Sequence, residues 1–158
     1  MSAIDKLIGE FRTGEIIDDN GSTLIFTGKL GNQEISLSDL ESEIGDEIPA
    51  SISRFIKIFG GSKLYVDEYG LGIEILRANE IIGHNLKQQI TTDSFWPDFV
   101  IFGYISSDDM LVYCKPERKF GVLDHEAWGD TELWRTEATN WYDFEECLES
   151  LVRKKGDI

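Results

Sequence analysis

Cysteine and histidine are scarce in this sequence, and their spacing excludes several kinds of site. The 158 residues include two cysteines and two histidines. Neither Cys114 and Cys147 nor His84 and His125 have the spacing of a zinc or redox motif. We therefore expect no metal, no cofactor and no disulfide, and we expect the two reduced thiols to be buried in the core.

The sequence also lacks the segments that send a protein to a membrane or hold it there. No apolar run approaches the ~20 residues that a helix needs to cross a bilayer. The N-terminus has no basic segment followed by a long apolar one, so it does not resemble a secretory signal. These absences predict a cytoplasmic protein without membrane association.

Basic residues are also few in this sequence. Lysine and arginine total 15 against 30 aspartates and glutamates, which gives a formal net charge of -15. Nucleic acids and anionic membranes bind clusters of basic residues, so we expect neither as a direct partner. Two interpretations of the charge stay open at this point. It keeps the protein soluble, or it forms a binding surface for a strongly basic partner.

What the sequence does contain is a succession of short apolar segments separated by turn residues. Hydrophobic residues make up 41% of the chain and aromatic residues 11%, which suits a single folded core at this length. Alternating or wholly apolar segments bounded by Gly, Asn and Asp predict strands. These segments lie at 15–17, 23–26, 29–30, 33–35, 63–66, 72–75, 99–102, 110–114 and 120–123.

Apolar residues at helical spacing predict helices on both sides of the strands. One of them begins with Pro49 and ends with Gly60 and Gly61, where glycine can adopt the left-handed conformation. Asn140 is expected to cap the last helix, with Trp141 on its buried face. Successive strands with helices before and after them predict an α+β fold. We expect a single domain over residues 1–158, in which helices flank a central antiparallel meander. The predicted helices cover 2–13, 38–45, 49–59, 77–88 and 140 to about 154.

The order of several short motifs resembles the SUKH superfamily. Ile48-Pro49 opens a helix that ends in Phe59-Gly60-Gly61, and the strand Asp98-Phe99-Val100-Ile101-Phe102-Gly103 follows. Gly121-Val122-Leu123-Asp124-His125 and Asn140-Trp141-Tyr142-Asp143-Phe144 complete the order. The family's usual Leu-Pro, Asn-Gly-Gly and Ser-Phe are replaced here by Ile-Pro, Phe-Gly-Gly and Asn-Trp.

The superfamily includes yeast-type cell-wall assembly regulators and many bacterial immunity proteins. The resemblance covers residues 37–154 and leaves 1–36 as an N-terminal helix and hairpin extension. It implies an α+β protein with a central antiparallel sheet. It also implies a non-catalytic protein that binds and neutralises a cognate toxin, often a nuclease. The alternative that it implies is a regulatory protein-interaction module, and it assigns no catalytic residue in either case.

A small hydrolase is a third hypothesis. A carboxylate beside a histidine, as in Asp124-His125-Glu126, can provide a general base. Successive residues of a strand point to opposite faces, however, so His125 does not share a face with the two carboxylates. The sequence also has no nucleophile at a recognisable spacing from them. We therefore predict that the protein is not an enzyme.

A binding site for a basic toxin needs carboxylates and an apolar anchor. A nuclease active site is basic because it holds phosphate, so an acidic surface can occupy it in place of the nucleic acid. Carboxylates steer a basic partner toward the complex, and tryptophan is common among interface hot spots. The residues that we predict to bind the partner are Asp108, Asp109, Glu126, Trp128, Asp130, Glu132 and Trp134.

Overall fold

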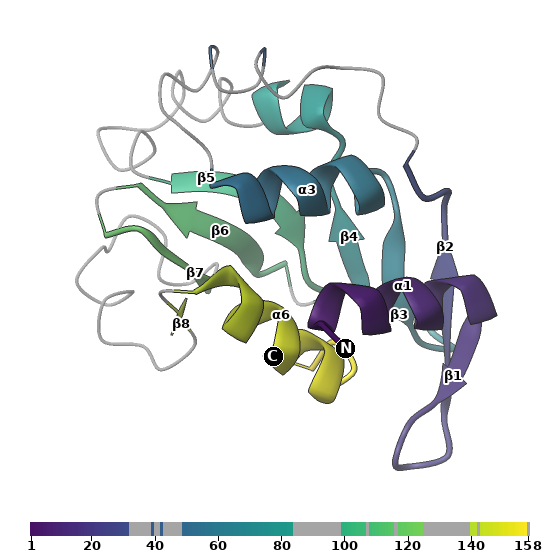
Figure 1. Ribbon diagram of the computed structural model, residues 1–158. Helices are drawn as coiled ribbons and strands as arrows, with labels where there is room; N and C mark the ends of the chain where they lie inside the picture. Colours follow the sequence, from purple (N-terminus) through teal and green to yellow (C-terminus); the bar gives the residue numbers. More distant parts are fainter. Residues whose placement is uncertain are drawn as a thin grey trace.

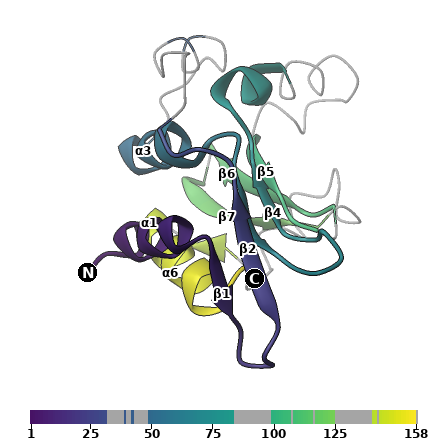
Figure 2. The same cartoon turned by 90° about the vertical axis from the view of Figure 1, so that its right-hand side faces the viewer.

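The computed structural model describes residues 1–31, 39, 42, 49–83, 99–106, 108–115, 117–124, 140–141 and 143–157. Within these residues, eight strands form one antiparallel sheet. The helices α1, α3 and α6 lie together on one face of that sheet (Figures 1 and 2). The protein is therefore a single α+β domain with a central antiparallel meander, as the sequence predicts. In the described ranges, no helix is long and apolar enough to cross a membrane.

The strands lie side by side in the order in which they occur in the sequence, and each pairs antiparallel with the next. Strands β1 and β2 belong to the same sheet as the others, so the N-terminal extension is part of this domain. The strands are β1 (Glu15–Ile17), β2 (Thr23–Thr27), β3 (Lys63–Val66), β4 (Ile73–Ile75), β5 (Phe99–Tyr104), β6 (Met110–Cys114), β7 (Lys119–Leu123) and β8 (Asn140–Trp141).

The helices are α1 (Ala3–Thr13), α3 (Ala50–Phe59) and α6 (Phe144–Arg153). The side-chain oxygen of Ser2 accepts a hydrogen bond from the Asp5 amide and caps α1, and Gly14, with φ 89°, ends this helix. The Ala3 amide donates to the Glu145 carboxylate over 2.8 Å, which joins α1 to α6. Residues 78–83 are also helical.

The core between the helices and the sheet contains a continuous series of contacts between aromatic rings. Phe55 of α3 lies at its centre, because its ring centroid is 5.1 Å from Phe59, 5.4 Å from Phe144 and 6.4 Å from Phe102. The series extends in both directions from these residues. The further pairs are Phe59 with Phe11, Phe11 with Phe26, Phe26 with Tyr65, Phe144 with Phe120, and Phe120 with Tyr113.

Strand β3 contains one extra residue opposite β2. Ile25 pairs with Val66 and Thr27 with Lys63, so two residues of β3 lie opposite the single residue Phe26. One of the two is Tyr65, whose φ of 53° lies in a region that bulky side chains rarely adopt.

Contacts made by the Tyr65 side chain compensate for this strained backbone. Its ring centroid is 4.9 Å from that of Phe26, and its hydroxyl donates a 2.6 Å hydrogen bond to Glu10 of α1. Burial, with the adjacent Glu10 carboxylate, raises the pKa of Tyr65, so the hydroxyl keeps the proton that it donates. The extra residue therefore holds α1 against the sheet.

The predicted start of the last helix is wrong. Asn140 and Trp141 form β8, where they pair with Gly121 and Phe120 of β7. The helix α6 begins at Phe144, and its cap is Asp143, whose side-chain oxygen accepts from the Glu145 amide over 3.0 Å. Asparagine and aspartate are both good cap residues, and the pairing of 140–141 with β7 decides between them.

Two other local predictions need correction. Only Gly61 is left-handed at the end of α3, with φ 84°, whereas Gly60 has φ -55°. Residues 29–30 are not a strand, because the Gly31 amide donates to the Ile58 carbonyl of α3 over 2.8 Å and directs this segment toward the helix. The predicted strand at 33–35 and most of the predicted helix at 38–45 lie outside the described residues, as does the predicted helix at 77–88 beyond residue 83.

Replacing Phe55 with alanine should lower the free energy of unfolding by about 3–5 kcal/mol, because it removes ring contacts with a second helix and with the sheet and leaves a cavity. Lys57→Ala, at an exposed position of the same helix, should change it by less than about 0.5 kcal/mol. Urea unfolding followed by circular dichroism measures both. Equal effects of the two substitutions would contradict the central position of Phe55.

Candidate functional site

The face of the sheet opposite the helices carries a row of residues that pair directly across six strands. Lys63 and Glu74 are exposed in this row, Tyr104 is half-buried, and the row becomes apolar and buried beyond it. Paired residues of antiparallel strands point to the same face, so the register places these side chains next to one another. The pairs are Thr27–Lys63, Lys63–Glu74, Glu74–Tyr104, Tyr104–Met110 and Met110–Leu123.

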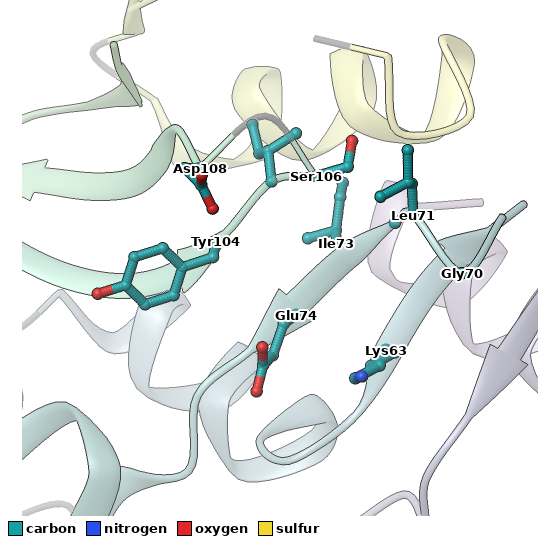
Figure 3. Close-up of a pocket in the computed structure, with 10 residues that line it drawn as sticks. Lys63, Gly70, Leu71, Ile73, Glu74, Tyr104, Ser106 and Asp108 are labelled. Atoms are coloured by element: carbon teal, nitrogen blue, oxygen red, sulfur yellow. The ribbon is translucent and has the colours of Figure 1, made fainter. Parts of the chain in front are cut away.

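A pocket of about 300 Å³ lies over the polar half of this row. Figure 3 shows Lys63, Glu74 and Tyr104 on neighbouring strands, with Leu71 and Asp108 at the turns. Asp108 is the one lining residue that the sequence analysis assigned to the site. The others could not be found without the register, although the alternation around Glu74 does place it on the face opposite Ile73 and Ile75.

The chemistry of this pocket suits binding. Burial, together with the Glu74 carboxylate, raises the pKa of Tyr104. Its hydroxyl is therefore protonated at neutral pH, where it can donate a hydrogen bond and cannot act as a base. Lys63, Glu74 and Asp108 place charges of both signs around the pocket. This arrangement can hold a polar or charged side chain of a partner.

Three hairpin loops, two of which line this pocket, share one backbone geometry. They span residues 18–22, 67–71 and 105–109. In each, the amide of the first residue donates to the carbonyl of the fifth, and the amide of the fourth donates to the carbonyl of the first. The fourth residue is left-handed in all three, with φ 80° at Gly21, 81° at Gly70 and 68° at Asp108. This is a three-residue hairpin connection that matches the twist of the strands it joins.

These loops lie at the same end of the sheet. They connect β1 to β2, β3 to β4 and β5 to β6, and in an antiparallel meander every second turn lies at the same end. The loops carry six carboxylates and no basic residue, and we call this group the acidic end. Its members are Asp18, Asp19, Asp67, Glu68, Asp108 and Asp109.

Two carboxylates of the acidic end stabilise their own loops. An oxygen of Asp18 accepts from the amides of Asn20 and Ser22 at 2.9 and 2.8 Å. Asp67 makes the equivalent bonds to Tyr69 and Leu71, both at 2.9 Å.

Three of the other four carboxylates are exposed to solvent. Asp19 is 98% exposed and pairs with Lys155 at 3.2 Å, while Glu68 and Asp108 are exposed and Asp109 is half-buried. The acidic end therefore presents negative charge beyond what the turns themselves require.

The loop between β6 and β7, at the opposite end of the sheet, differs in charge. It contains Lys115, Arg118 and Lys119, together with Glu117, which pairs with Lys119 at 3.7 Å. Basic residues thus outnumber acidic ones in this loop. Among the described residues, this loop therefore differs in charge from the three loops of the acidic end.

Two of the residues predicted to bind a partner lie close together in the structure, and their role in binding stays a prediction. The structure places Asp108 and Asp109 together in the third loop of the acidic end. The carboxylates of the first two loops, Asp18, Asp19, Asp67 and Glu68, are not in the set predicted from the sequence. The proximity of these carboxylates could have been predicted, because each loop holds adjacent carboxylates. Every second turn of a predicted antiparallel meander lies at the same end of the sheet. The remaining predicted residues, Glu126, Trp128, Asp130, Glu132 and Trp134, lie outside the described residues.

A second hollow, of about 740 Å³, lies along α1 and α6. Its lining mixes basic side chains such as Lys6 and Arg153 with acidic ones such as Glu146 and Glu149. Mixed charge of this kind does not select a ligand of one sign. Among the described residues, no group of three or more His, Cys, Asp or Glu side chains could hold a metal ion.

Both cysteines are buried thiols, as the sequence predicts, and they do not form a disulfide. Burial raises the pKa of Cys147 to about 12. Since the thiolate is the reactive form of cysteine, the Cys147 side chain is an apolar packing group at neutral pH.

No family model and no curated protein sequence matches this chain. The resemblance to the SUKH superfamily therefore stays a prediction that rests on the motifs and their order. Any function assigned to the chain must be argued from the geometry and charge described above.

Substitutions at Asp108 test the left-handed backbone of the third loop. We expect the stability of the variants to follow the order glycine, aspartate, alanine. About 1 kcal/mol should separate glycine from alanine, because an L side chain is strained in this conformation and aspartate tolerates it better than alanine. At Ser106, the second residue of the same loop, glycine should be no more stable than alanine. Thermal unfolding measures both series, and an Asp108→Ala variant as stable as Asp108→Gly would contradict the assigned geometry.

Proposed function

We propose that this chain is a non-catalytic immunity protein that binds and neutralises a cognate basic toxin, most simply a nuclease. The observation that supports this proposal is the acidic end, where three loops from distant parts of the sequence present their carboxylates together. The resemblance to the SUKH superfamily points in the same direction. The mechanism is occlusion, in which carboxylates occupy the surface that the toxin uses to hold phosphate.

The size of the acidic end suits a protein interface. Neighbouring strands lie ~4.8 Å apart, so loops two strands apart are separated by about 10 Å, and the three loops span about 20 Å. A specific interface buries about 800 Å² per partner, an area of similar width. The Debye length at physiological ionic strength is about 8 Å, so a partner group that approaches midway between two loops, about 5 Å from each, interacts with the charges of both.

The first test is co-expression with the neighbouring open reading frame. Immunity genes normally sit beside their toxin genes, so we expect the neighbour to be toxic when expressed alone and harmless when expressed with this protein. The two chains should also purify as a one-to-one complex. A neighbour that is harmless, or that is toxic without being rescued or bound, would favour a regulatory protein-interaction module instead.

A second prediction concerns the association rate of that complex. The double variant Glu68→Gln/Asp108→Asn removes two exposed charges from the acidic end, and asparagine keeps the left-handed residue tolerable. We expect association with the toxin to slow about three- to tenfold at low salt, because fewer charges steer the encounter. The wild-type rate should also fall strongly as salt is added.

The matched control is Glu146→Gln/Glu149→Gln, which removes two exposed charges from α6. This variant should associate at close to the wild-type rate. Stopped-flow or surface plasmon resonance measurements at several salt concentrations compare the three proteins. An association rate that is insensitive to salt, or that falls equally in both variants, would contradict steering by the acidic end.

A further inference from the structure

Exposed apolar side chains are concentrated on two hairpins of this protein. Apart from Met1, the large hydrophobic residues that are exposed in the described chain are Ile17 at 67%, Ile25 at 40%, Tyr69 at 78% and Leu71 at 49%. All four belong to the β1–β2 and β3–β4 hairpins. We call them the hairpin patch.

The register places Ile17 and Ile25 on the face of the sheet that the helices leave uncovered. Leu24 and Phe26 are buried, and Ile25 lies between them, so it points the opposite way. Ile17 pairs with Thr23, which puts Ile17 and Ile25 in diagonal positions about 7–8 Å apart. The patch therefore begins at the edge strand β1 and continues onto β2.

Leu71 and Tyr69 extend this patch to the next hairpin. Leu71 lines the pocket that also contains Lys63 and Glu74 (Figure 3), and Tyr69 precedes it in the adjoining loop. The side chain of Tyr69 makes no contribution to the loop bonds, which use its amide. An aromatic side chain with this exposure, next to aliphatic ones, has the composition of an interface anchor.

Carboxylates lie beside the hairpin patch, together with Lys63 of the pocket and Lys155, which pairs with Asp19. Asp18 and Asp19 follow Ile17 directly, Glu68 precedes Tyr69, and Asp108 lies with Leu71 on the lining of the same pocket. An apolar centre with an acidic rim is complementary to a basic surface that contains apolar side chains. We infer that the hairpin patch is the docking site for a strongly basic protein, which Tyr69 and Leu71 contact at the centre of the interface.

This inference rests on the proposed function. It places the binding surface on residues that are not in the set predicted from the sequence. Charge argues against a second copy of this chain as the occupant. The net charge is -15, and a symmetric contact through the patch would bring two acidic rims together, which costs free energy. Strand β1 spans only Glu15–Ile17, so its edge offers little for pairing with another strand.

Two loops of identical backbone geometry provide a matched pair of variants. Tyr69 is the third residue of its loop, and Asn20 is the third residue of the preceding one. We expect Tyr69→Ser/Leu71→Ser to weaken binding to the toxin at least tenfold, mainly through faster dissociation, with an unchanged salt dependence of association. Asn20→Ser should bind as wild type does, and both variants should unfold at close to the wild-type urea concentration.

The probe for this test is a catalytically inactive form of the neighbouring gene's product, measured by surface plasmon resonance. If wild type binds it and Tyr69→Ser/Leu71→Ser binds equally well, the proposed function stands and the docking site is overturned. Sedimentation velocity of the free protein adds a check. A wild-type dimer that the double variant abolishes would show that a second copy covers the patch, which also overturns the inference.

A second probe does not involve the toxin. It tests the hairpin patch as a docking site separately from the proposed function as an immunity protein. It is a short synthetic peptide of alternating lysine and leucine, added to ¹⁵N-labelled protein. We expect amide shifts to concentrate in residues 17–25 and 66–72 and to spare 117–119, and a lysine-only peptide should give smaller shifts. If the toxin is not bound but the peptide localises in this way, the proposed function fails and the basic-partner site stands. Peptide shifts that spread evenly, or that fall along α1 and α6, would overturn the site whatever the toxin does.

Discussion

The packing of Phe55 against Phe102 and Phe144 joins one helix to the sheet and to a second helix, and the rest of the fold depends on it. From this point, ring contacts continue to Phe59 and Phe11 on one side and to Phe120 on the other. All of these contacts lie on one face of the sheet. With the helices fixed there, the opposite face of β1–β4 and the turns beside it stay available to a partner.

Carboxylates that are distant in the sequence come together in space only in the folded state. Acidic residues are spread along the sequence, and their number alone favours simple solubility over a binding surface. The antiparallel meander places its first, third and fifth turns at one end of the sheet, and those turns are acidic. The turn between β6 and β7, at the other end, is rich in lysine and arginine. Topology thus brings the carboxylates of three separate loops to one end of the sheet.

Left-handed residues occur both in the core and at the surface, with different consequences. Tyr65 is held in this conformation by its ring contact with Phe26 and its hydrogen bond to Glu10, and it fixes α1 on the sheet. Asp108 occupies, at an exposed position, the place that glycine fills in the two sister loops. Aspartate is more strained there than glycine, so its presence is better explained by its charge than by the turn.

The sequence by itself determined the fold class and most of the strands, because alternation and turn residues are local signals that survive in the structure. It also predicted the turn that contains Asp108, since adjacent carboxylates between two strands are visible without a fold. It assigned Asn140 and Trp141 to a helix, because the choice between two good cap residues depends on whether β7 offers a pairing edge. Only the tertiary structure brought Lys63, Glu74 and Tyr104 into one pocket and placed Tyr69 and Leu71 within an acidic rim. Tyr104 is far from Lys63 and Glu74 in the chain, and strand register, which depends on the burial of the opposite face, is what brings it beside them.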